Sequence, residues 1–232
     1  SPSWKVYPNT TNRSTSVFLD KEGNVMKQKQ RQAKLERKSK ETEIKIKLNI
    51  DGQGKTSIKT PLGILDHMLE LFAFHGFFDL DLRVKGDTHI DIHHTNEDIG
   101  IVLGKAFKDA LGRMQGIRRF GAAFAPMENT LGHSVIDISG RGHFKFNYEG
   151  ARGKADEGLE GYNFSYLEHF MESFAKQLGA NLIITVNNPS ASADLHTIME
   201  TVFKSLGMAL DQATQVDPRR KGAVPSTKGI ID

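Results

Sequence analysis

The feature that most constrains the fold of this chain is an internal repeat. The segment "LDHMLELFAFHGFFDLDLRV" (65–84) matches "LEHFMESFAKQLGANLIITV" (167–186) in its order of apolar and polar residues. Both segments begin with apolar residues at helical spacing and end in the alternation typical of a strand. A second helical pattern follows each of them, "TNEDIGIVLGKAFKDALG" and "HTIMETVFKSLGMALDQA". A match of this length predicts two copies of one structural unit.

Each helix pair is preceded by residues that alternate as strands. In "ETEIKIKLNIDGQGKTSIKT" Asp51-Gly52 predicts a hairpin, and in "HSVIDISGRGHFKFNYEG" a turn is expected at Ser139-Gly140. We therefore expect an α+β fold: a tandem duplication of a sheet-plus-two-helices half domain, pseudo-two-fold, with helices packed between or against the sheets. The expected parts are a disordered basic leader (1–36), a first half (37–125), a second half (126–216) and a substrate-binding tail (217–232).

The charge of the chain is unevenly distributed. Residues 1–40 carry ten Lys and Arg against three Asp and Glu, whereas the net charge of all 232 residues is only +3. No aromatic side chains are interleaved in the basic run to stack on bases, so we interpret it as a solvated arm rather than a nucleic-acid surface. No apolar run is long enough to span a bilayer, and the polar N-terminus predicts no signal peptide. We expect no membrane partner and a cytoplasmic protein, with a plastid as the alternative.

The repeat also carries chemistry. In each half a histidine on the first helix is followed by an HxxxE pattern on the second. These residues are His67, His93, Glu97, His169, His196 and Glu200. Residues four apart lie on one helical face, so the His and the Glu can both bind one divalent ion. A single HxxxE is a common surface pair, but its recurrence in register favours a metal site.

His94 follows His93 on the same helix and points about a hundred degrees away from it. It would therefore serve a different ion or a different chain. The chain has no cysteine, so any metal must be held by nitrogen and oxygen ligands. Such ligands suit Mn, Fe, Co, Ni or Zn, and a six-coordinate shell favours Mn or Fe. His75, His133 and His143 have no comparable partners, and we assign them no function.

Three short segments could bind a phosphate monoester. "GIRRFG" (116–121) places Arg118 and Arg119 between glycines, "ISGRG" (138–142) presents Arg141 on a turn, and "PSTKG" (225–229) offers Ser226 and Lys228. Arginine forks and a Ser/Lys pair suit phosphate oxygens, although arginines in turns are usually only solvated. No Walker A loop or GxGxxG motif is present, which counts against nucleotide binding.

These motifs together resemble a known family. "LDHMLELFAFHG", "GDTHIDIHHTNEDIG", "GIRRFG", "ISGRG", "LEHF", "HTIMETVFK" and "DPRRKGAVPSTKG" follow one another as in imidazoleglycerol-phosphate dehydratases, the lyases of histidine biosynthesis. The resemblance runs from about Arg37 to the C-terminus. It implies metal-dependent dehydration of D-erythro-imidazole-glycerol phosphate to imidazole acetol phosphate, by two Mn²⁺ ions in active sites between the subunits of a 24-subunit homo-oligomeric shell.

The resemblance also implies roles for individual residues. The metal ligands would be His67, His93, His94, Glu97, His169, His196 and Glu200. The residues that hold the phosphorylated imidazole substrate would be Arg119, Arg141, Lys204, Ser226 and Lys228. Glu41, in "RKSKETEI", matches a site-facing glutamate. The group that transfers the proton could be Glu41, Glu97 or Glu200, and the sequence does not decide among these carboxylates.

The chain departs from the family pattern at one expected ligand. Thr197 stands where the resemblance implies the second histidine of an HHxxE motif, so one of the two expected Mn²⁺ sites would lack an imidazole. A threonine hydroxyl is a poor ligand for a divalent transition metal. Two other functions therefore stay open: a weakened or inactive paralogue that keeps the fold as a metal-binding scaffold, and a metal-dependent phosphate-ester hydrolase.

Overall fold

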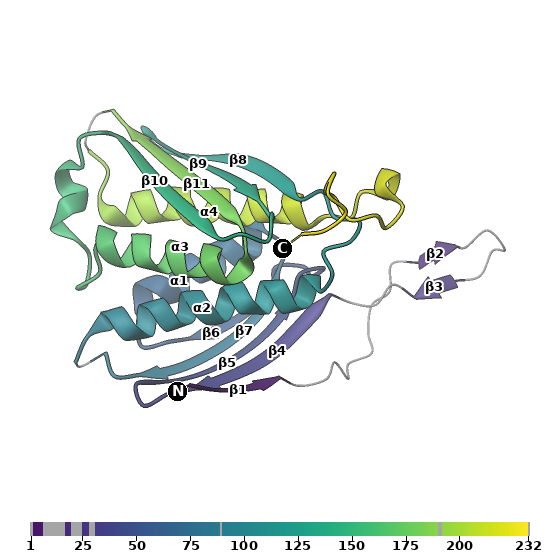
Figure 1. Ribbon diagram of the computed structural model, residues 1–232. Helices are drawn as coiled ribbons and strands as arrows, with labels where there is room; N and C mark the ends of the chain where they lie inside the picture. Colours follow the sequence, from purple (N-terminus) through teal and green to yellow (C-terminus); the bar gives the residue numbers. More distant parts are fainter. Residues whose placement is uncertain are drawn as a thin grey trace.

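Four layers make up the protein, with helices enclosed between two sheets. The computed structural model describes residues 2–6, 17–19, 25–27, 31–88, 90–189 and 192–231. In Figure 1 one sheet lies at the bottom and the other at the top, and α1, α2, α3 and α4 fill the space between them. The predicted α+β duplication is thus confirmed, with the helices between the sheets rather than outside them.

The first half supplies the lower sheet and two helices. Its strands and helices are β4 (Gln32–Lys38), β5 (Thr42–Asn49), β6 (Thr56–Lys59), α1 (Gly63–His75), β7 (Asp79–Gly86) and α2 (Ile92–Leu111). The N-terminal strand β1 (Ser3–Val6) joins the same sheet, whose order is β1-β4-β5-β7-β6. A separate short ribbon pairs β2 (Val17–Leu19) with β3 (Val25–Lys27).

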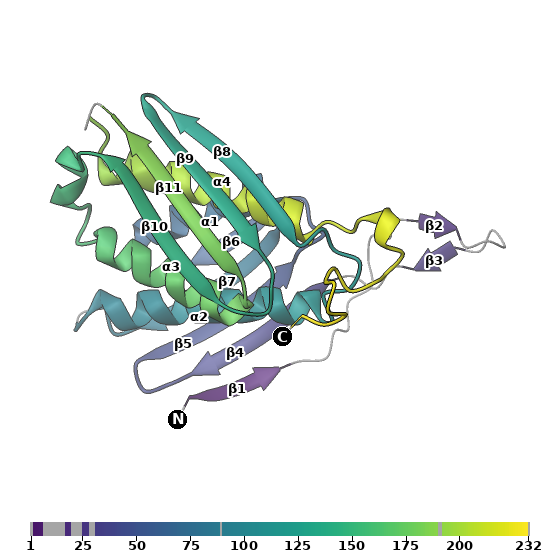
Figure 2. The same cartoon turned by 45° about the horizontal axis from the view of Figure 1, so that its top comes forward.

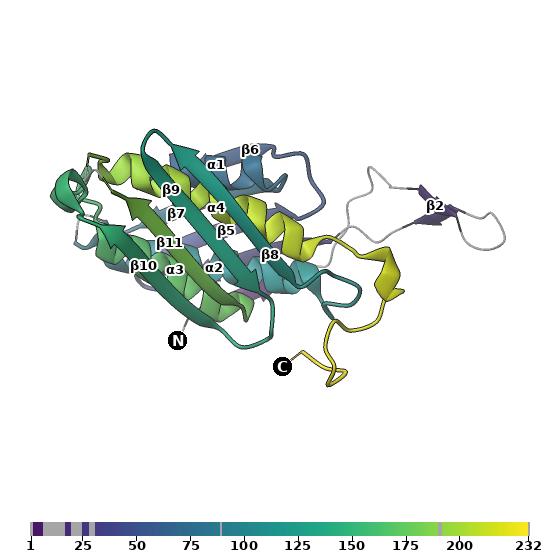
Figure 3. The same ribbon diagram turned by 90° about the horizontal axis from the view of Figure 1, so that it is seen from above.

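The second half repeats this order of elements. Its strands and helices are β8 (Phe120–Met127), β9 (Thr130–Asp137), β10 (His143–Gly150), α3 (Phe164–Leu178), β11 (Asn181–Asn188) and α4 (Leu195–Thr214). Two 3₁₀ turns, η1 (Gly153–Glu157) and η2 (Pro218–Arg220), lie before α3 and after α4. Figure 2 shows the upper sheet in the order β10-β11-β9-β8, and Figure 3 shows from above how it covers α3 and α4.

The two predicted hairpins are wrong in the same way. β6 does not pair with β5, because β7 lies between them and β6 runs parallel to β7. Likewise β10 does not pair with β9, because β11 lies between them and β10 runs parallel to β11. Each half therefore contains a strand–helix–strand crossover, which lays α1 and α3 against the inner faces of their sheets. The turns at Asp51-Gly52 and Ser139-Gly140 start these crossovers instead of closing a hairpin.

The expected boundaries of the leader and of the halves also need correction. β4 begins at Gln32 and β1 pairs with it in the register Trp4↔Arg37, so parts of the expected leader 1–36 belong to the lower sheet. Its remaining residues, 7–16, 20–24 and 28–30, lie outside the described residues, as do Ser1 and His89. The boundary at 125/126 falls inside β8, a strand of the upper sheet.

The core is continuous across the halves because their helices pack in crossed pairs. α1 of the first half packs on α4 of the second, and α2 packs on α3. A Cβ added at Gly207 of α4 would lie 2.4 Å from the carbonyl oxygen of Phe72, and one at Gly104 of α2 would lie 2.4 Å from that of Phe174. These glycines let each helix pair approach closely. Phe72 and Phe174 themselves meet edge to face at 6.3 Å between ring centroids.

No helix in the described ranges is both long enough and apolar enough to cross a membrane.

Candidate metal centres

The crossed packing brings His67 of α1 beside His196 and Glu200 of α4, and we name these three residues the α1/α4 cluster. Each offers a ligand atom, and the three atoms lie within 4.8 Å of one another. Glu200 Oε1 lies 2.9 Å from His196 Nε2 and 3.4 Å from His67 Nε2. Two imidazole nitrogens and one carboxylate oxygen at this spacing fit a divalent transition metal.

A lysine occupies the other oxygen of this carboxylate. Lys204, one turn further along α4, donates to Glu200 Oε2 at 2.5 Å. The side chain of Glu200 is only 12% exposed. Burial alone would raise the pKa of Glu200, but hydrogen bonds from Lys204, His67 and His196 outweigh it, so the pKa of this carboxyl lies below its usual value. The site therefore keeps Glu200 ionised and ready to act as a ligand.

A looser group of the same residue types lies between the other two helices, and it does not bring three ligand atoms within 4.8 Å of one another. His93 and Glu97 of α2 face His169 of α3, and we name these residues the α2/α3 cluster. His93 Nδ1 and His169 Nδ1 are 3.2 Å apart, and His93 Nε2 lies 3.6 Å from Glu97 Oε2. The cluster opens into a cavity of about 230 Å³ between the helices. Both clusters thus take one histidine from one half of the chain and the His/Glu pair from the other.

The N-termini of α2 and α4 fix the direction of their His/Glu faces. Asp91 caps α2 by accepting from the amide of His93 at 2.9 Å, and Asp194 caps α4 by accepting from the amide of Thr197 at 2.8 Å. The same backbone donors are the main reason that the pKa values of both aspartates are lowered. The two aspartate caps lie at matching positions, so both helices begin at the same distance in sequence from their His/Glu pairs.

His94 and Thr197 occupy equivalent positions, and neither belongs to a cluster of this chain. The ring centroid of His94 lies 6.0 Å from that of His93, and its Nδ1 is buried without a hydrogen-bond partner among the described residues. Thr197 lies in the first turn of α4, next to its cap. The substitution of threonine for the implied histidine therefore leaves the α1/α4 cluster intact within this chain.

The residues expected to hold substrate are placed in different ways. Lys204 lies beside the α1/α4 cluster, where it donates to Glu200. Arg119 forms a two-pronged ion pair with Asp137, at 2.6 and 3.0 Å, and its third nitrogen donates to the carbonyl of Pro225 at 2.9 Å. The guanidinium thereby ties the C-terminal tail, next to Ser226, to the upper sheet.

The other expected binding residues lie at the surface. Arg141 and Lys228 are exposed, and neither side chain makes a hydrogen bond or ion pair with another described residue. Ser226 accepts from the amide of Lys228 at 3.2 Å in the tail. Glu41 is exposed on the turn between β4 and β5, and its carboxylate also has no such partner among the described residues.

Two residues near these groups were given no function from the sequence. Asp137, the partner of Arg119, ends β9, and its position just before the turn of "VIDISG" was the only available signal. His75 ends α1 near Lys204 and Glu200. Burial, and then the positive charge of Lys204, lower the pKa of His75. This favours a neutral imidazole beside the α1/α4 cluster at neutral pH.

The fold and the paired clusters define a class of protein: a duplicated α+β enzyme with two imidazole–carboxylate centres, each assembled from both halves of the chain. The family model of imidazoleglycerol-phosphate dehydratase matches residues 60–210. The chain belongs to the imidazoleglycerol-phosphate dehydratase family, whose members are hydro-lyases of histidine biosynthesis.

Individual relatives agree with this assignment. The imidazoleglycerol-phosphate dehydratase of Geobacillus kaustophilus (strain HTA426) is 47% identical over 182 residues, which is 78% of this chain and 89% of the relative. The crystal structure of the enzyme from Pyrococcus furiosus, in complex with (S)-C348, is 35% identical, covers 84% of this chain and 99% of its own, and superposes with a TM-score of 0.68.

The enzyme from Staphylococcus aureus is 29% identical, covers 75% of this chain and 95% of its own, and gives a TM-score of 0.65. These comparisons support the dehydration step of histidine biosynthesis and favour neither the scaffold nor the phosphate-ester hydrolase.

Proposed function

We propose that the two clusters hold Mn²⁺ and that the chain uses them to remove water from D-erythro-imidazole-glycerol phosphate, giving imidazole acetol phosphate. The observation that carries the proposal is the convergence of ligand atoms of His67, His196 and Glu200 within 4.8 Å of one another. The α2/α3 cluster repeats the residue types in a looser arrangement. The donor sets contain nitrogen and oxygen only, which Mn²⁺ accepts. A bound Mn²⁺ would polarise the imidazole of the substrate and so make the adjacent C–H bond more acidic.

The residues of this chain have separable tasks in the reaction. Dehydration removes a proton from one carbon and a hydroxyl from its neighbour, so a base must accept the proton and an acid must protonate the leaving oxygen. Glu41 is the candidate for moving the proton, because its carboxylate is exposed and belongs to neither cluster. Glu97 and Glu200 are already engaged with histidines and act as ligands in this scheme.

The phosphate of the substrate would be held by cations around the α1/α4 cluster and the tail. Lys204 lies beside the α1/α4 cluster, and Arg119 fixes the segment that carries Ser226 and Lys228. Arg141 offers an exposed guanidinium at the edge of the upper sheet. Arginine and lysine donors of this kind bind phosphate oxygens with charge-assisted hydrogen bonds.

We further propose that active sites form between copies of this chain, in a shell of 24 subunits. The outward-facing positions of the upper sheet support this arrangement, because Phe120 and Phe124 are each 57% exposed and Ile183 is 43% exposed. Such side chains are commonly covered by another subunit.

The test measures Mn per chain by elemental analysis and substrate turnover by NMR, on the parent and on Thr197→His. Two Mn per chain with turnover in the parent is the expected result. One Mn in the parent and two in Thr197→His would mean that residue 197 is needed for the second site. Absence of Mn from both proteins, or two bound Mn without turnover, would contradict the proposal.

A further inference from the structure

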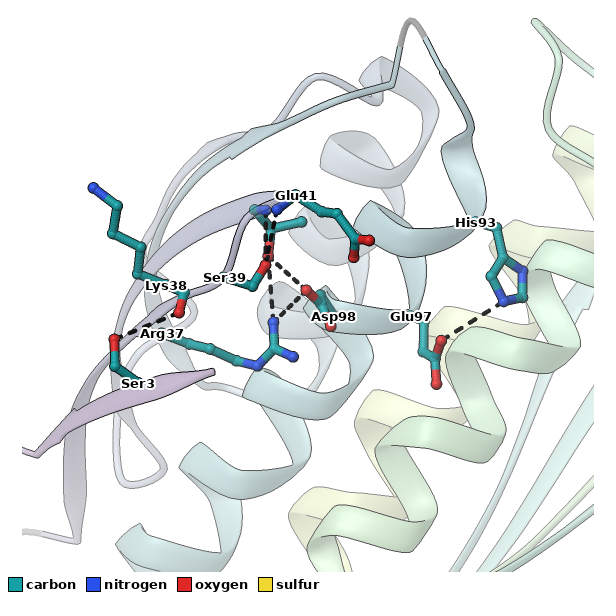
Figure 4. Close-up of polar contacts among 9 residues, drawn as sticks. Ser3, Arg37, Lys38, Ser39, Glu41, His93, Glu97 and Asp98 are labelled. Atoms are coloured by element: carbon teal, nitrogen blue, oxygen red, sulfur yellow. Dashed lines mark hydrogen bonds and ion pairs between the residues drawn. The ribbon is translucent and has the colours of Figure 1, made fainter. Parts of the chain in front are cut away.

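A buried ion pair outside both clusters joins β4 to α2. Arg37 Nη1 pairs with Asp98 Oδ2, and each side chain is only 10% exposed. The hydroxyl of Thr42 donates to the same aspartate oxygen at 2.5 Å, and Arg37 Nη1 also lies 3.3 Å from this hydroxyl. Figure 4 shows Arg37 and Asp98 meeting between the turn that carries Glu41 and the helix that carries Glu97.

Two of the three residues in this network are chain neighbours of glutamates assigned above to the reaction. Thr42 directly follows Glu41, and Asp98 directly follows Glu97. The glutamates point to solvent, with the side chain of Glu97 44% exposed, whereas Thr42 and Asp98 are both buried. A bond between the two buried neighbours therefore sets the separation of the backbones from which both carboxylates extend.

The turn between the strands is closed by its own hydrogen bonds. Ser39 Oγ accepts from the amides of Glu41 and Thr42 at 3.2 and 3.0 Å, and the amide of Ser39 donates to the carbonyl of Thr42 at 2.9 Å. The backbone of Glu41 also accepts from the amide of Asp87 at 3.2 Å. With the turn closed in this way, the bond from Thr42 to Asp98 fixes Glu41 itself and not merely the end of β5.

The N-terminal strand covers the outer side of the ion pair. β1 pairs with β4 in the register Ser3↔Lys38 and Trp4↔Arg37. The ring of Trp4 lies over the Arg37 guanidinium at 5.7 Å and near the Lys105 ammonium at 5.6 Å. Excluding water from one side of the pair strengthens its attraction, because the local dielectric falls.

A contribution to stability does not by itself explain why this ion pair is buried. The desolvation of two charges offsets most of the Coulomb attraction in a buried pair, and apolar residues of similar volume often serve the fold equally well. Here the cost is larger, because Arg37 Nε is buried without a partner among the described residues. What the pair does provide is a directional link between two particular backbone segments, and such a link is what positioning requires.

We propose that Arg37, Thr42 and Asp98 form a brace that positions Glu41 relative to Glu97 for the dehydration. The inference rests on the proposed function, since it assumes that Glu41 acts on the substrate and that Glu97 belongs to a metal centre. None of the three residues need touch substrate or metal, so they are positioning residues.

The test compares Thr42→Val with Thr42→Ser, because valine keeps the buried volume and removes the donor, whereas serine keeps the donor. In Thr42→Val we expect kcat to fall roughly 10- to 100-fold, as for a reacting group displaced by about 1 Å, with a much smaller change in KM. Faster hydrogen exchange is expected at the amides of Glu41 and Thr42, with the Mn content unchanged. Thr42→Ser should restore most of kcat.

Two further variants distinguish a failure of the brace from a failure of the proposed function. Arg31→Gln is the matched control, since it removes an ion pair to Asp51 next to the start of β4, far along the strand from Glu41; it should lower stability and leave kcat unchanged. Glu41→Gln tests the proposed function itself. If Glu41→Gln abolishes turnover while folded Thr42→Val keeps kcat, the brace is overturned and the proposed function survives. If Glu41→Gln has the same kcat as the parent, the role proposed for Glu41 is wrong, and the brace that depends on it is wrong as well.

Asp98→Asn, a near-isosteric change, replaces Thr42→Val if that variant does not fold. It weakens the pair with Arg37 but retains an oxygen that can accept from Thr42. A fall in kcat with unchanged Mn content supports the brace, and an unchanged kcat contradicts it.

Discussion

The α1/α4 and α2/α3 clusters share a plan but differ in charge and access. Glu200 is 12% exposed and has a lysine on its second oxygen, whereas Glu97 is 44% exposed and has none. The residue one turn beyond Glu97, equivalent to Lys204, is Ile101, which lines the cavity beside the cluster. With neutral histidines, Glu200 and Lys204 together carry no net charge, whereas the α2/α3 cluster carries one negative charge. A duplicated scaffold can thus keep its geometry and still give its two centres different electrostatics.

The largest effect is expected from removing the single histidine that each cluster takes from the opposite half. His67→Ala and His169→Ala should each lower kcat on the order of 10³-fold, similar to the loss of a preorganised electrostatic group. Each variant should also lose Mn at its own centre only. Elemental analysis and steady-state kinetics measure both effects. If either variant kept full Mn content and kcat, the two clusters would not be equivalent metal centres.

The next effect concerns the helix crossings beneath the clusters. Gly104→Ala and Gly207→Ala each place a Cβ 2.4 Å from a backbone carbonyl, so the helices must move apart. We expect each to lower the free energy of unfolding by about 1–3 kcal/mol, the usual cost of overpacking. Urea denaturation measures this, with the exposed Gly63→Ala, where no atom lies within 4 Å, as a control for the space an added Cβ needs. Unequal losses would show that the two crossings are not equivalent.

A smaller effect should follow from exchanging the lysine between the clusters. Lys204→Met removes a positive charge beside Glu200, and we expect the affinity of the α1/α4 cluster for Mn²⁺ to rise roughly tenfold. Ile101→Lys adds a charge one turn beyond Glu97 and should weaken the α2/α3 cluster by a similar factor. Calorimetric titration distinguishes the two sites. Changes in the same direction in both variants would contradict a purely electrostatic origin.

The smallest effect is on the pH dependence of stability of the metal-free protein. Because the pKa of Glu200 in the folded state lies below its ordinary value of 4.5, its contacts stabilise the fold above that value. This stabilisation is lost as pH falls through the lowered folded-state pKa. Glu200→Gln should therefore destabilise the protein more at about pH 6 than at about pH 3. Equal losses at both values, measured by urea denaturation, would exclude the linkage.

The sequence predicted the repeat, the four helices and the residues of both clusters, because these depend on local periodicity. It did not predict which histidine joins which His/Glu pair. His67 meets Glu200 rather than Glu97 because α1 packs on α4, and this choice depends on the packing of the whole helical layer. The same limit explains the two wrong hairpins, since the parallel partner of β6 lies beyond α1 in the chain.

β4 escaped the sequence reading for a different reason. Its inward positions are Ala33, Leu35 and Arg37, so the alternation that marks a strand is hidden by a buried arginine. That arginine pairs with Asp98, 61 residues away along the chain, and it also contacts Thr42 and Trp4. Arg37 is therefore a charged residue at an inward position of a strand, and its partner Asp98 could not be recognised from the sequence.

The exchange of helices between the halves has an evolutionary consequence. A half-length ancestor could have assembled a complete cluster only by pairing with a second copy of itself, and both clusters of that dimer would have been identical. Fusion of two copies in one chain would release each centre to mutate independently. Lys204 opposite Ile101 and Thr197 opposite His94 record that divergence. The single chain thus permits a division of labour that a symmetric ancestor could not achieve.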